Sequence, residues 1–527
     1  MSAAGPSQGA NSAAPAARGA AKPQAWGDSA SHVASRVVRG RYLDSVSLMR
    51  FSQRLSALPG VAEAAVMIGS DTNKRLMRDS GLLAGDAAAA QPTDLIVGVR
   101  ASDEAAAQNA LESVDSLLAA PGARDTAGGV TRARTLDGAT KALPGANVAL
   151  ISVPGEFAAA EAAKALRAGL HVLLFSNNVA LEDERRLKML ARERGLLLMG
   201  ADCGTSLVNG VPLAFANAVP RGGVGVVAAS GTGLQEVTTL VARAGGGISH
   251  GIGVGGRDLR DEIGGITTLM AIDALDADPA TTHVVIVSKP PAPRVAKSVL
   301  ERITRSAKPF TVCLLGQADL ELPANARRAH TLREAAELAL GGQRFAPDFV
   351  SRATLPKPAG RRLRGLYCGG TLCAEAQLVL LAAGEAVASN APVPGARALE
   401  TPDDGAARHA IVDLGADEYT RGRPHPMIEP AIRTEPLRAA VADPATAVVL
   451  LDVVIGYGAH ADPAGALADA LAQMPAGRPP VVASVCGTEA DPQGYSRQVH
   501  TLERAGVVVA PSNAHAAELA VRVLRSR

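Results

Sequence analysis

The chain has 527 residues, 47% of them hydrophobic and 20% charged, which is enough apolar material for several buried cores and excludes disorder over most of its length. At about 150 residues per domain, this length corresponds to about three to four domains. The 53 Lys and Arg against 51 Asp and Glu leave a net charge of +2, and aromatic residues are only 2%, so binding to nucleic acid or to an anionic membrane is not expected.

Two further features of composition bear on location and cofactors. The longest apolar run, near Ala445–Ala459, contains Asp452 and is too short to cross a bilayer. The five cysteines are scattered and form no CxxC pair, which argues against a disulfide framework and against a zinc site. The composition therefore predicts a cytoplasmic, multidomain protein without a bound metal.

The order of apolar runs predicts α/β domains built on parallel sheets. Residues 1–35 are mostly Ala, Gly, Ser and Pro, lack the apolar core of a signal peptide, and are predicted to be a disordered tail. From Val37 onward, short apolar runs alternate with helical stretches, which is typical of βα units. The strands expected in chain order are 95–99, 148–153, 172–175, 196–199, 224–228, 284–287, 310–315, 363–367, 411–414, 448–454 and 481–485.

Breaks in this pattern divide the chain. The segment AVPRGG at 218–223 precedes a fresh strand, and the Pro-rich, basic stretch around 345–362 is typical of a linker. The predicted organisation is three consecutive Rossmann-like or flavodoxin-like units. It comprises a tail at 1–35, a first unit at 36–220, a second at 221–345, a linker at 346–361 and a third unit at 362–527.

A strand that runs directly into a glycine-rich turn and a helix occurs twice. The first turn contains Ser230, Gly231, Thr232 and Gly233, and the second contains Gly369, Gly370 and Thr371. Small residues at such a turn let backbone N–H groups approach an anion, and the helix dipole favours negative charge there. Neither turn is a Walker A loop. Each alone is also explained as a capped βα turn, but two matching turns indicate two helix N-termini directed at one phosphate.

Other candidate residues lie after predicted strands, where ligands of α/β proteins bind. Cys203 follows the strand ending at Met199, and is either a ligand-binding thiol or a small buried one. Lys289 closes another strand and would neutralise an anion, or else is a surface lysine. The pair Asn177 and Asn178 is either an edge loop of a site or a plain turn.

A dense polar loop, DLGADEYTRGRPHPMIEP, starts at the end of the strand predicted at 411–414. It contains Asp413, Asp417, Glu418, Arg421, Arg423 and His425. Two arginines can grip a carboxylate or phosphate in a bidentate manner, and His425 stands between two prolines that restrict its backbone. The alternative is a proline-stiffened surface loop with solvated charge pairs.

The order of several long motifs resembles the FdrA family, from about Arg36 to the end of the chain. These motifs include LLMGADCGTSLVNG, ASGTGLQEV, GIGVGGRDL, CGGTLCAEA, DLGADEYTRGRPHPMIEP and VVLLDVVIGYGAHADP. That family is similar to succinyl-CoA synthetase, in which the helices after the corresponding turns point at one phosphate. The resemblance therefore places both turns around one shared phosphate. The remaining candidates are Lys289 and His425 for catalysis, and Asn177, Asn178, Cys203, Arg421 and Arg423 for substrate binding.

The departures from succinyl-CoA synthetase point to different chemistry. The segment that carries its phosphorylated histidine has no counterpart after Gly316, its Glu-Ile-Gly-Gly strand end reads Ser288 to Pro291, and the glycine fingerprint for the CoA nucleotide is missing. What the FdrA resemblance implies is a subunit of an oxamate carbamoyltransferase in allantoin or purine breakdown. Phosphate and carbamoyl phosphate would then be substrates, with oxamate's carboxylate held by Arg421 or Arg423, and further protein subunits as partners.

Two other interpretations stay open. One is an NDP-forming acyl-CoA synthetase, or a fragment of one, for which CoA would be a cofactor in spite of the missing fingerprint. The other is a non-catalytic scaffold subunit that binds phosphate. The ligands expected on every interpretation are small anions.

Overall fold

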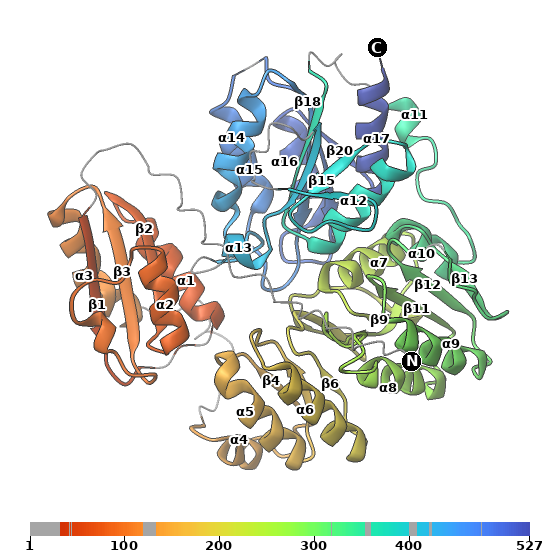
Figure 1. Cartoon of the computed structure of the whole chain (residues 1–527), viewed down its shortest axis with the longest axis horizontal. Coiled ribbons are helices and arrows are strands. Elements are labelled where there is room, and N and C mark those ends of the chain that lie inside the picture. The colour runs from red at the N-terminus through yellow and green to blue at the C-terminus, as the bar shows by residue number, and fades with distance from the viewer. Residues whose placement is uncertain are drawn as a thin grey trace, which may run out of the picture.

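The computed structural model describes residues 32–526 except 42, 44, 120–132, 318, 354–359, 400–407, 421–423 and 476. The described residues form a mixed α/β fold whose four sheets follow one another along the chain (Figure 1). Two sheets have seven strands each and are largely parallel, and two have three strands each. The predicted α/β class with large parallel sheets is therefore confirmed.

The first unit is an antiparallel sheet with the strand order β1-β3-β2, which stands apart at the left of Figure 1. Its sheet is covered on both faces, because alternate residues of the central strand pack into two different clusters: Val97 with α1 and α3, and Ile96 with α2 and η1. In chain order its elements are β1 (His32–Val38), α1 (Ser45–Ser56), β2 (Val61–Ile68), α2 (Asp71–Asp79), η1 (Gly85–Ala89), β3 (Leu95–Ala101) and α3 (Glu104–Ala119).

The predicted first unit, residues 36–220, thus contains two complete sheets of different type and, at 205–208 and 211–214, two strands of the third sheet. An apolar strand that is buried on both faces looks the same in a parallel and an antiparallel sheet, so the run at 95–99 did not reveal its direction. The first four residues of β1 fall within the predicted tail, and they are ordered by pairing with β3, as in His32 opposite Ala101. The rest of that tail lies outside the described residues.

The second unit is a small parallel sheet with the order β4-β5-β6. Its elements are α4 (Leu136–Ala142), β4 (Val148–Ile151), α5 (Gly155–Arg167), β5 (His171–Leu174), α6 (Leu181–Glu193) and β6 (Leu198–Met199). Alanines of α5 and the strand residues Val172 and Leu174 form its core, because small side chains let the helix lie close to the sheet.

The third unit is a seven-stranded sheet with the order β13-β12-β11-β9-β10-β7-β8, parallel except for β7 and β8. Its elements are β7 (Thr205–Val208), β8 (Val211–Ala214), β9 (Arg221–Ala228), α7 (Gly231–Arg243), β10 (Ile248–Gly253), α8 (Ile266–Ala277), β11 (His283–Ser288), α9 (Pro293–Thr304), β12 (Phe310–Leu314), β13 (Ala326–Arg328) and α10 (Leu332–Ala339). The predicted linker contains the short helix α11 (Phe349–Arg352), and its residues 354–359 lie outside the described part.

The fourth unit is a parallel seven-stranded sheet with the order β16-β15-β17-β14-β18-β19-β20. Its elements are β14 (Arg362–Tyr367), α12 (Gly370–Ala382), β15 (Val387–Ser389), β16 (Arg397–Ala398), β17 (His409–Asp413), α13 (Asp417–Thr420), η2 (Pro430–Arg433), α14 (Thr434–Ala442), β18 (Thr446–Val454), α15 (Pro463–Ala472), β19 (Val481–Cys486), α16 (Tyr495–Arg504), β20 (Val507–Ala510) and α17 (Asn513–Arg525).

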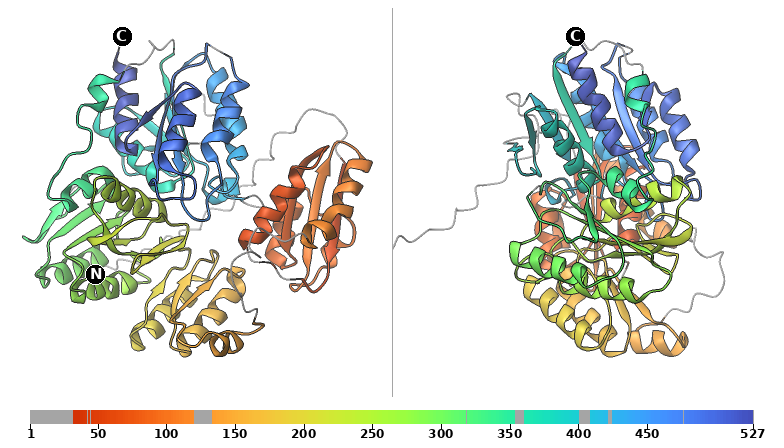
Figure 2. Two further views of the ribbon diagram at one scale, coloured as in Figure 1. Left: turned by 180° about the vertical axis from the view of Figure 1, so that it is seen from behind. Right: turned by 90° about the vertical axis from the view of Figure 1, so that its right-hand side faces the viewer.

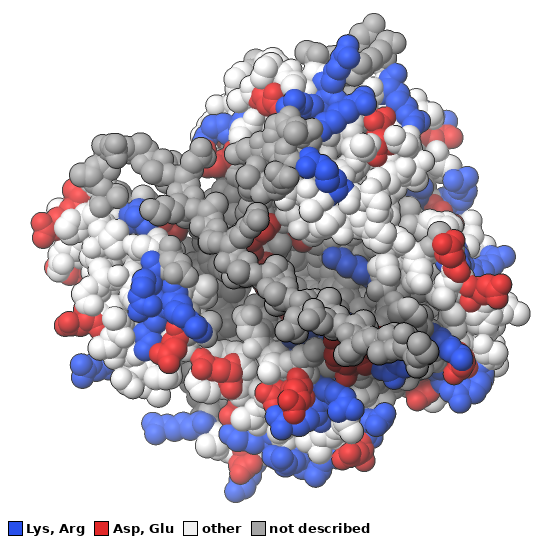
Figure 3. Space-filling view, in the orientation of Figure 1, with Lys and Arg blue, Asp and Glu red and all other residues white. Residues whose placement is uncertain are grey.

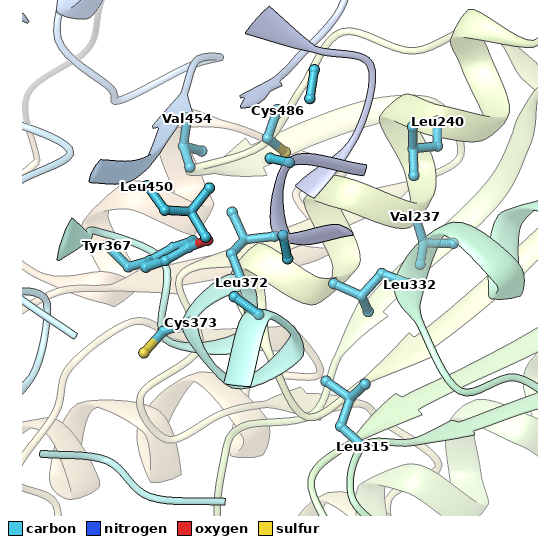
Figure 4. Packing of buried hydrophobic residues seen from close by; sticks show 14 of the residues in the cluster. Val237, Leu240, Leu315, Leu332, Tyr367, Leu372, Cys373, Leu450, Val454 and Cys486 are labelled. Atoms are coloured by element: carbon cyan, nitrogen blue, oxygen red, sulfur yellow. The ribbon is translucent and has the colours of Figure 1, made fainter. Parts of the chain in front are cut away.

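The third and fourth units lie against each other in every view of Figures 1 and 2. They share one cluster of buried apolar residues, to which α7 and α10 contribute from one side and α12 and α17 from the other. Figure 4 shows Val237 and Leu332 from the third unit near Leu372 from the fourth. The two units therefore form one packed body rather than two domains joined only by a linker.

The segment just before β9 fixes how these two units are docked. The side-chain amide of Asn217, which is fully buried, donates to Ile455 O and to Asp491 Oδ2, both at 2.8 Å. The next backbone N–H, of Ala218, donates to Asp491 Oδ1 at 2.7 Å, and Tyr457 N donates to Ala216 O at 2.9 Å. A short stretch of the third unit is thus hydrogen-bonded into loops at the carboxyl edge of the fourth sheet.

A buried charge network joins the second and third units. The ammonium of Lys188 on α6 is fully buried, 2.6 Å from Asp258 Oδ1 and 3.2 Å from Glu184 Oε1. Asp258 also accepts from Thr268 N and Oγ1, and Arg257 pairs with Glu184 Oε2 at 2.6 Å. Buried charges of this kind persist only when paired, so the network fixes α6 against the loop after β10.

On the face shown in Figure 3, lysines and arginines alternate with aspartates and glutamates over the described part, as the net charge of +2 leads one to expect. None of the helices formed by described residues combines the length and apolarity needed to traverse a bilayer.

Replacing the buried lysine should destabilise the fold. In Lys188→Met the carboxylates of Asp258 and Glu184 stay buried without their ammonium partner, so the free energy of unfolding should fall by about 3–5 kcal/mol in urea denaturation. The matched control is Lys164→Met on α5, whose ion pair with Glu161 is exposed and should contribute less than about 1 kcal/mol. Equal losses in the two variants would contradict the stabilising role of the buried network.

Candidate anion site between two helix N-termini

The two glycine-rich turns meet in the structure, although they are 141 residues apart in the chain. Ser230 caps α7 by accepting from Gly233 N at 3.0 Å, and its hydroxyl is hydrogen-bonded to the hydroxyl of Thr371 in the first turn of α12. The seven residues that the sequence analysis assigned to phosphate binding are therefore brought together in space. Their role as phosphate ligands stays a prediction.

Glycines at this contact let the two turns approach each other very closely. A Cβ on Gly233 would lie 3.1 Å from Thr371 Cγ2, and a Cβ on Gly369 would lie 3.1 Å from Thr232 Cγ2. Each turn thus places a threonine methyl against a glycine of the other turn. Larger side chains at either glycine would separate the two helix ends.

Several backbone N–H groups at the two helix ends are left for a ligand. Among the described residues, no acceptor takes the first-turn N–H of Gly231 or Thr232 on α7, or of Gly370 or Thr371 on α12. Free donors and aligned helix dipoles give both ends a positive potential. Gly231, Thr232 and Gly370 are partly exposed, so an anion can reach them from solvent.

The backbone of the second turn is hydrogen-bonded to a buried aspartate. Asp452 lies in β18, is fully buried, and accepts from Cys368 N at 2.8 Å and from Gly369 N at 2.7 Å. Arg433, 3% exposed, lies 3.4 Å from Asp452 Oδ1 and donates to Leu366 O at 2.9 Å. The carboxylate therefore occupies the donors just before α12 and leaves those of its first turn for another acceptor.

A second aspartate lies beside the start of α12. Asp413, at the end of β17, is 8% exposed, and its Oδ1 accepts from Gly415 N at 2.9 Å. Its Oδ2 lies 2.7 Å from the position that a Cβ on Gly370 would take. Burial raises the pKa of Asp413 to about 6, although the charge of Lys289 acts in the opposite direction. Asp413 begins the polar loop in the sequence, and no local pattern there predicts that it lies beside α12.

The two predicted catalytic residues have different surroundings. Lys289 is exposed just after β11, within electrostatic range of Asp413. His425 accepts at Nδ1 from Met427 N at 3.2 Å, and its ring lies against Gly415. Burial lowers the pKa of His425 to about 4, so its imidazole is neutral at pH 7. Their catalytic roles stay predictions.

Three of the predicted substrate-binding residues lie on two adjacent segments, which are joined by hydrogen bonds from Asp202 N to Ser176 O and from Cys203 N to Leu174 O. Asn177 and Asn178 are exposed on the loop after β5. Cys203 is 4% exposed in an apolar cluster, with its Sγ 3.5 Å from Thr205 O, and burial raises the pKa of its thiol to about 11. This geometry favours the alternative of a small buried thiol. Arg421 and Arg423 lie outside the described residues.

Two buried glutamates anchor the helices behind the paired turns. Glu236 and Glu375 each follow the threonine of their turn by four residues. Glu236 Oε1 accepts from Asn513 N at 3.0 Å, at the start of α17 in the fourth unit, and Glu375 Oε1 accepts from Leu332 N at 2.6 Å, at the start of α10 in the third. Each glutamate thus caps a helix of the opposite unit, and the side-chain amide of Asn513 joins them by donating to Glu375 Oε2 at 2.7 Å.

The capped helices repeat the same sequence, which extends this symmetry. The segments 335–339 of α10 and 516–520 of α17 both read AAELA, and the hydroxyls of Thr331 and Ser512 cap the two helices in the same way. The third and fourth units are therefore related by an approximate internal symmetry whose centre lies behind the paired turns. No signal from either unit alone would have predicted this pairing.

The segment after Gly316 lies away from the paired turns. A Cβ on Gly316 would lie 3.6 Å from Leu378, on the second half of α12, and 3.2 Å from Pro394, in the loop between β15 and β16. Gly316 and Gln317 line a groove there with Leu378 and Leu381. This is the part of the chain in which the sequence lacks the histidine segment of succinyl-CoA synthetase.

Comparisons with known proteins agree with this architecture. Family models match three stretches of the chain: a model described as AllF, heavy metal-associated domain, at residues 31–134, a CoA binding domain at 221–314, and a CoA-ligase at 366–523. The residues at 31–134 contain no cysteine, because all five lie at position 203 or beyond, so this stretch does not fit a metal held by thiolates. The described residues hold no group of three or more His, Cys, Asp or Glu suited to a metal ion.

Individual relatives match at different lengths. The chain is 38% identical over 503 residues to the uncharacterized protein YahF of Escherichia coli (strain K12). The aligned region covers 91% of this chain and 96% of YahF. It is 30% identical over 151 residues to the succinate–CoA ligase [ADP-forming] subunit alpha of Aquifex aeolicus, covering 28% of this chain and 48% of that subunit. A solved structure of the dinucleotide forming acetyl-coenzyme A synthetase 1 of Ca. Korarchaeum cryptofilum shares 18% identity with a TM-score of 0.31, over 72% of this chain and 83% of that one.

The fold and the paired turns define a CoA-ligase-like α/β protein, and such proteins are enzymes or subunits of enzymes. Within this class, the chain belongs to the FdrA family of succinyl-CoA synthetase-like proteins.

The buried glutamate on α12 should make stability depend on pH. Burial and the nearby Glu236 raise the pKa of Glu375 to about 7, above its ordinary value of 4.5, so the folded state binds more protons and loses stability as pH rises through 7. Glu375→Gln removes this loss. The difference in free energy of unfolding between Glu375→Gln and the wild type should therefore increase, in favour of the variant, by about 2–3 kcal/mol from pH 5 to pH 8, as measured by urea denaturation.

The control for this prediction is Glu503→Gln, on the exposed side of α16, which should keep the wild-type pH profile. A flat difference between Glu375→Gln and the wild type over this range would show that Glu375 is already ionised in the folded protein at pH 5.

Proposed function

We propose that the chain is a subunit of an oxamate carbamoyltransferase, which converts N-carbamoyl-oxamate and phosphate to oxamate and carbamoyl phosphate. A phosphate oxygen attacks the carbamoyl carbon, the bond from that carbon to the oxamate nitrogen breaks, and this nitrogen takes up a proton. The reaction needs a site that holds one phosphate group in both substrate and product. It needs no nucleotide and no phosphorylated side chain.

The observation that carries this proposal is the direct contact between Ser230 and Thr371, which sets two helix N-termini side by side. Their free N–H groups suit the oxygens of a single phosphate, and positive helix ends stabilise the charge that develops on it. The histidine segment of succinyl-CoA synthetase is absent from the sequence after Gly316, so phosphate held there would react directly rather than pass through a phosphohistidine.

Lys289 and the polar loop supply the remaining roles in the proposal. Lys289 is an exposed positive charge within electrostatic range of Asp413, and it would neutralise the phosphate as it attacks. Arg421 or Arg423 would hold the carboxylate of oxamate. His425, neutral at pH 7 and with its Nδ1 already accepting from Met427 N, would donate a hydrogen bond from Nε2–H to the oxamate nitrogen. The reaction belongs to the cytoplasm, and a further subunit would complete the site.

Turnover should depend on both the lysine and the glycine turn. The measurement is phosphate release from carbamoyl phosphate and oxamate, using the chain together with its co-purifying partners. Lys289→Ala should lower turnover by about 100-fold, because a group that stabilises developing charge is lost. Gly370→Trp should abolish it, because the indole would fill the space in front of α12 and displace Asp413.

Matched controls separate these effects from general damage. Lys297→Ala removes an exposed lysine of α9, and Gly477→Trp adds an indole at an exposed turn where a Cβ meets nothing within 4 Å. Both should keep wild-type turnover. Unchanged phosphate release in Lys289→Ala and Gly370→Trp would rule out a phosphate site between the two turns.

An acid–thiol ligase is the second candidate, and the relatives favour it, since the matched Aquifex protein is a succinate–CoA ligase subunit. This function predicts that CoA raises the melting temperature of the chain and that ATP leaves a covalent phosphate label on the complex. We expect neither, because the glycine fingerprint for the CoA nucleotide and the histidine segment are missing. Thioester formation from an acid, CoA and ATP would instead identify the protein as a ligase.

A further inference from the structure

We infer that Glu236 and Glu375 form one proton-binding site behind the paired turns, and that the turns bind an anion more tightly while this site holds its proton. The inference rests on the proposed function, because phosphate is the anion concerned, and it adds regulation of that site by pH. Both glutamates are buried, so they act on the anion through their charge and not by contact.

The donors that reach these two carboxyl groups from the described part of the chain are neutral. Glu375 Oε1 accepts from Leu332 N at 2.6 Å, and its Oε2 accepts from the side-chain amide of Asn513 at 2.7 Å. Glu236 Oε1 accepts from Asn513 N at 3.0 Å, and its carboxyl group is also hydrogen-bonded to the thiol of Cys486. One amide therefore joins two buried carboxyl groups, neither of which has a cation as its hydrogen-bond partner.

The charged and titratable groups around the pair do not neutralise it. Arg333 and Arg243 act on it by charge, but Arg333 forms two hydrogen bonds with Glu518 and Arg243 lies over the ring of Tyr495. Buried thiols and phenols, whose pKa values are raised, stay uncharged near pH 7. The other groups that face the pair are Cys313 on β12, Tyr367 on β14, Asp452 on β18, Cys486 on β19 and Tyr495 on α16, while Glu337 on α10 and His515 on α17 surround Arg333.

A single proton resolves the repulsion within the pair. Two buried carboxylates that share one amide repel each other, and burying both charges without a paired cation is costly. Asn513 offers an acceptor for a carboxyl O–H, because its Oδ1 is buried and has no donor among the described residues. Burial raises the pKa of both glutamates, and the charge of Glu236 adds to this effect at Glu375, whose pKa is about 7. The pair therefore holds one proton below neutrality and releases it above.

Charge on the pair acts on both helix ends. Each glutamate follows the threonine of its turn by four residues, or about 6 Å along the helix axis, which puts a ligand at the turns roughly 10 Å away. A second negative charge there opposes the positive potential of the helix N-termini. At an effective dielectric constant of about 20, a unit charge at roughly 10 Å changes the affinity for a singly charged anion by about 10-fold. The proton and the anion should therefore bind cooperatively.

The experiment uses sulfate as the probe, because its charge is constant between pH 6 and pH 8.5, whereas phosphate itself titrates in this range. Calorimetry on the full chain measures the dissociation constant of sulfate at both pH values. The wild type should bind sulfate about 10- to 100-fold more weakly at pH 8.5 than at pH 6, since sulfate carries two charges. Titrations at pH 7.5 in two buffers of different ionisation enthalpy should show that sulfate binding takes up protons.

Glu375→Gln has at every pH the single negative charge of the protonated pair. It should bind sulfate as the wild type does at pH 6, and about 10- to 100-fold more tightly than the wild type at pH 8.5. Glu236→Gln removes the other carboxylate and should give the same two results, which keeps the test decisive if Glu375→Gln folds poorly. Loss of hydrogen bonds alone would weaken sulfate binding at both pH values, so it would not reproduce this pattern.

The control is Glu503→Gln on the exposed side of α16, which should keep the wild-type pH profile. Asp413 also titrates beside α12, but it is present in every protein compared, so its effect cancels. If the wild type binds sulfate equally at both pH values, or if both glutamine variants keep its pH dependence, the inference is overturned while the anion site stands. If the wild type binds neither sulfate nor phosphate at pH 6, the anion site and the proposed function fail together with the inference.

Discussion

Two helices that meet at their N-termini repel each other, because both ends are positive and both carry backbone donors without partners. The candidate site depends on how the chain overcomes this repulsion between α7 and α12. The hydroxyls of Ser230 and Thr371 bridge the two ends, and the glycines of each turn accept the threonine methyl of the other. Negative charge from Asp452 and Asp413 lies close to α12 and offsets part of the remaining potential. What is left is a local excess of donors that an anion can satisfy.

The buried polar groups behind the turns explain why this arrangement is held in one geometry. Glu236 and Glu375 each cap a helix of the opposite unit, and Asn513 connects them. Apolar packing alone would allow α7 and α12 to slide along each other. Directional hydrogen bonds from fully buried groups permit one register, because any shift leaves a carboxylate without its donors. The apolar cluster therefore supplies the driving force, and the polar groups specify the alignment.

Much of this could be predicted from the sequence, and the exceptions have physical reasons. The parallel strands of the large sheets and the two turns follow from local patterns of apolar runs and glycines. The antiparallel direction of β3 could not be predicted, because a strand buried on both faces shows the same apolar run in either sheet type. Asp452 did leave a signal: an aspartate inside a nine-residue buried strand must have buried donors nearby, and here they belong to the turn before α12. Asp413 and the glutamate pairing depend on contacts between distant segments, which no local pattern contains.

The repeated AAELA helices and the matching Thr-to-Glu spacing mean that one polypeptide holds what amounts to two related halves of a dimer. The interface between them is rich in buried carboxylates and amides, and such an interface gains little from association between separate chains at low concentration. Joining the halves through the segment around α11 makes their encounter intramolecular, with a high effective concentration. The two halves need not be identical, since each position of the approximate symmetry occurs once in a given environment. The pair Leu332 and Asn513 illustrates this: at equivalent positions, Leu332 donates only from its backbone, whereas Asn513 also carries a side chain that joins both glutamates.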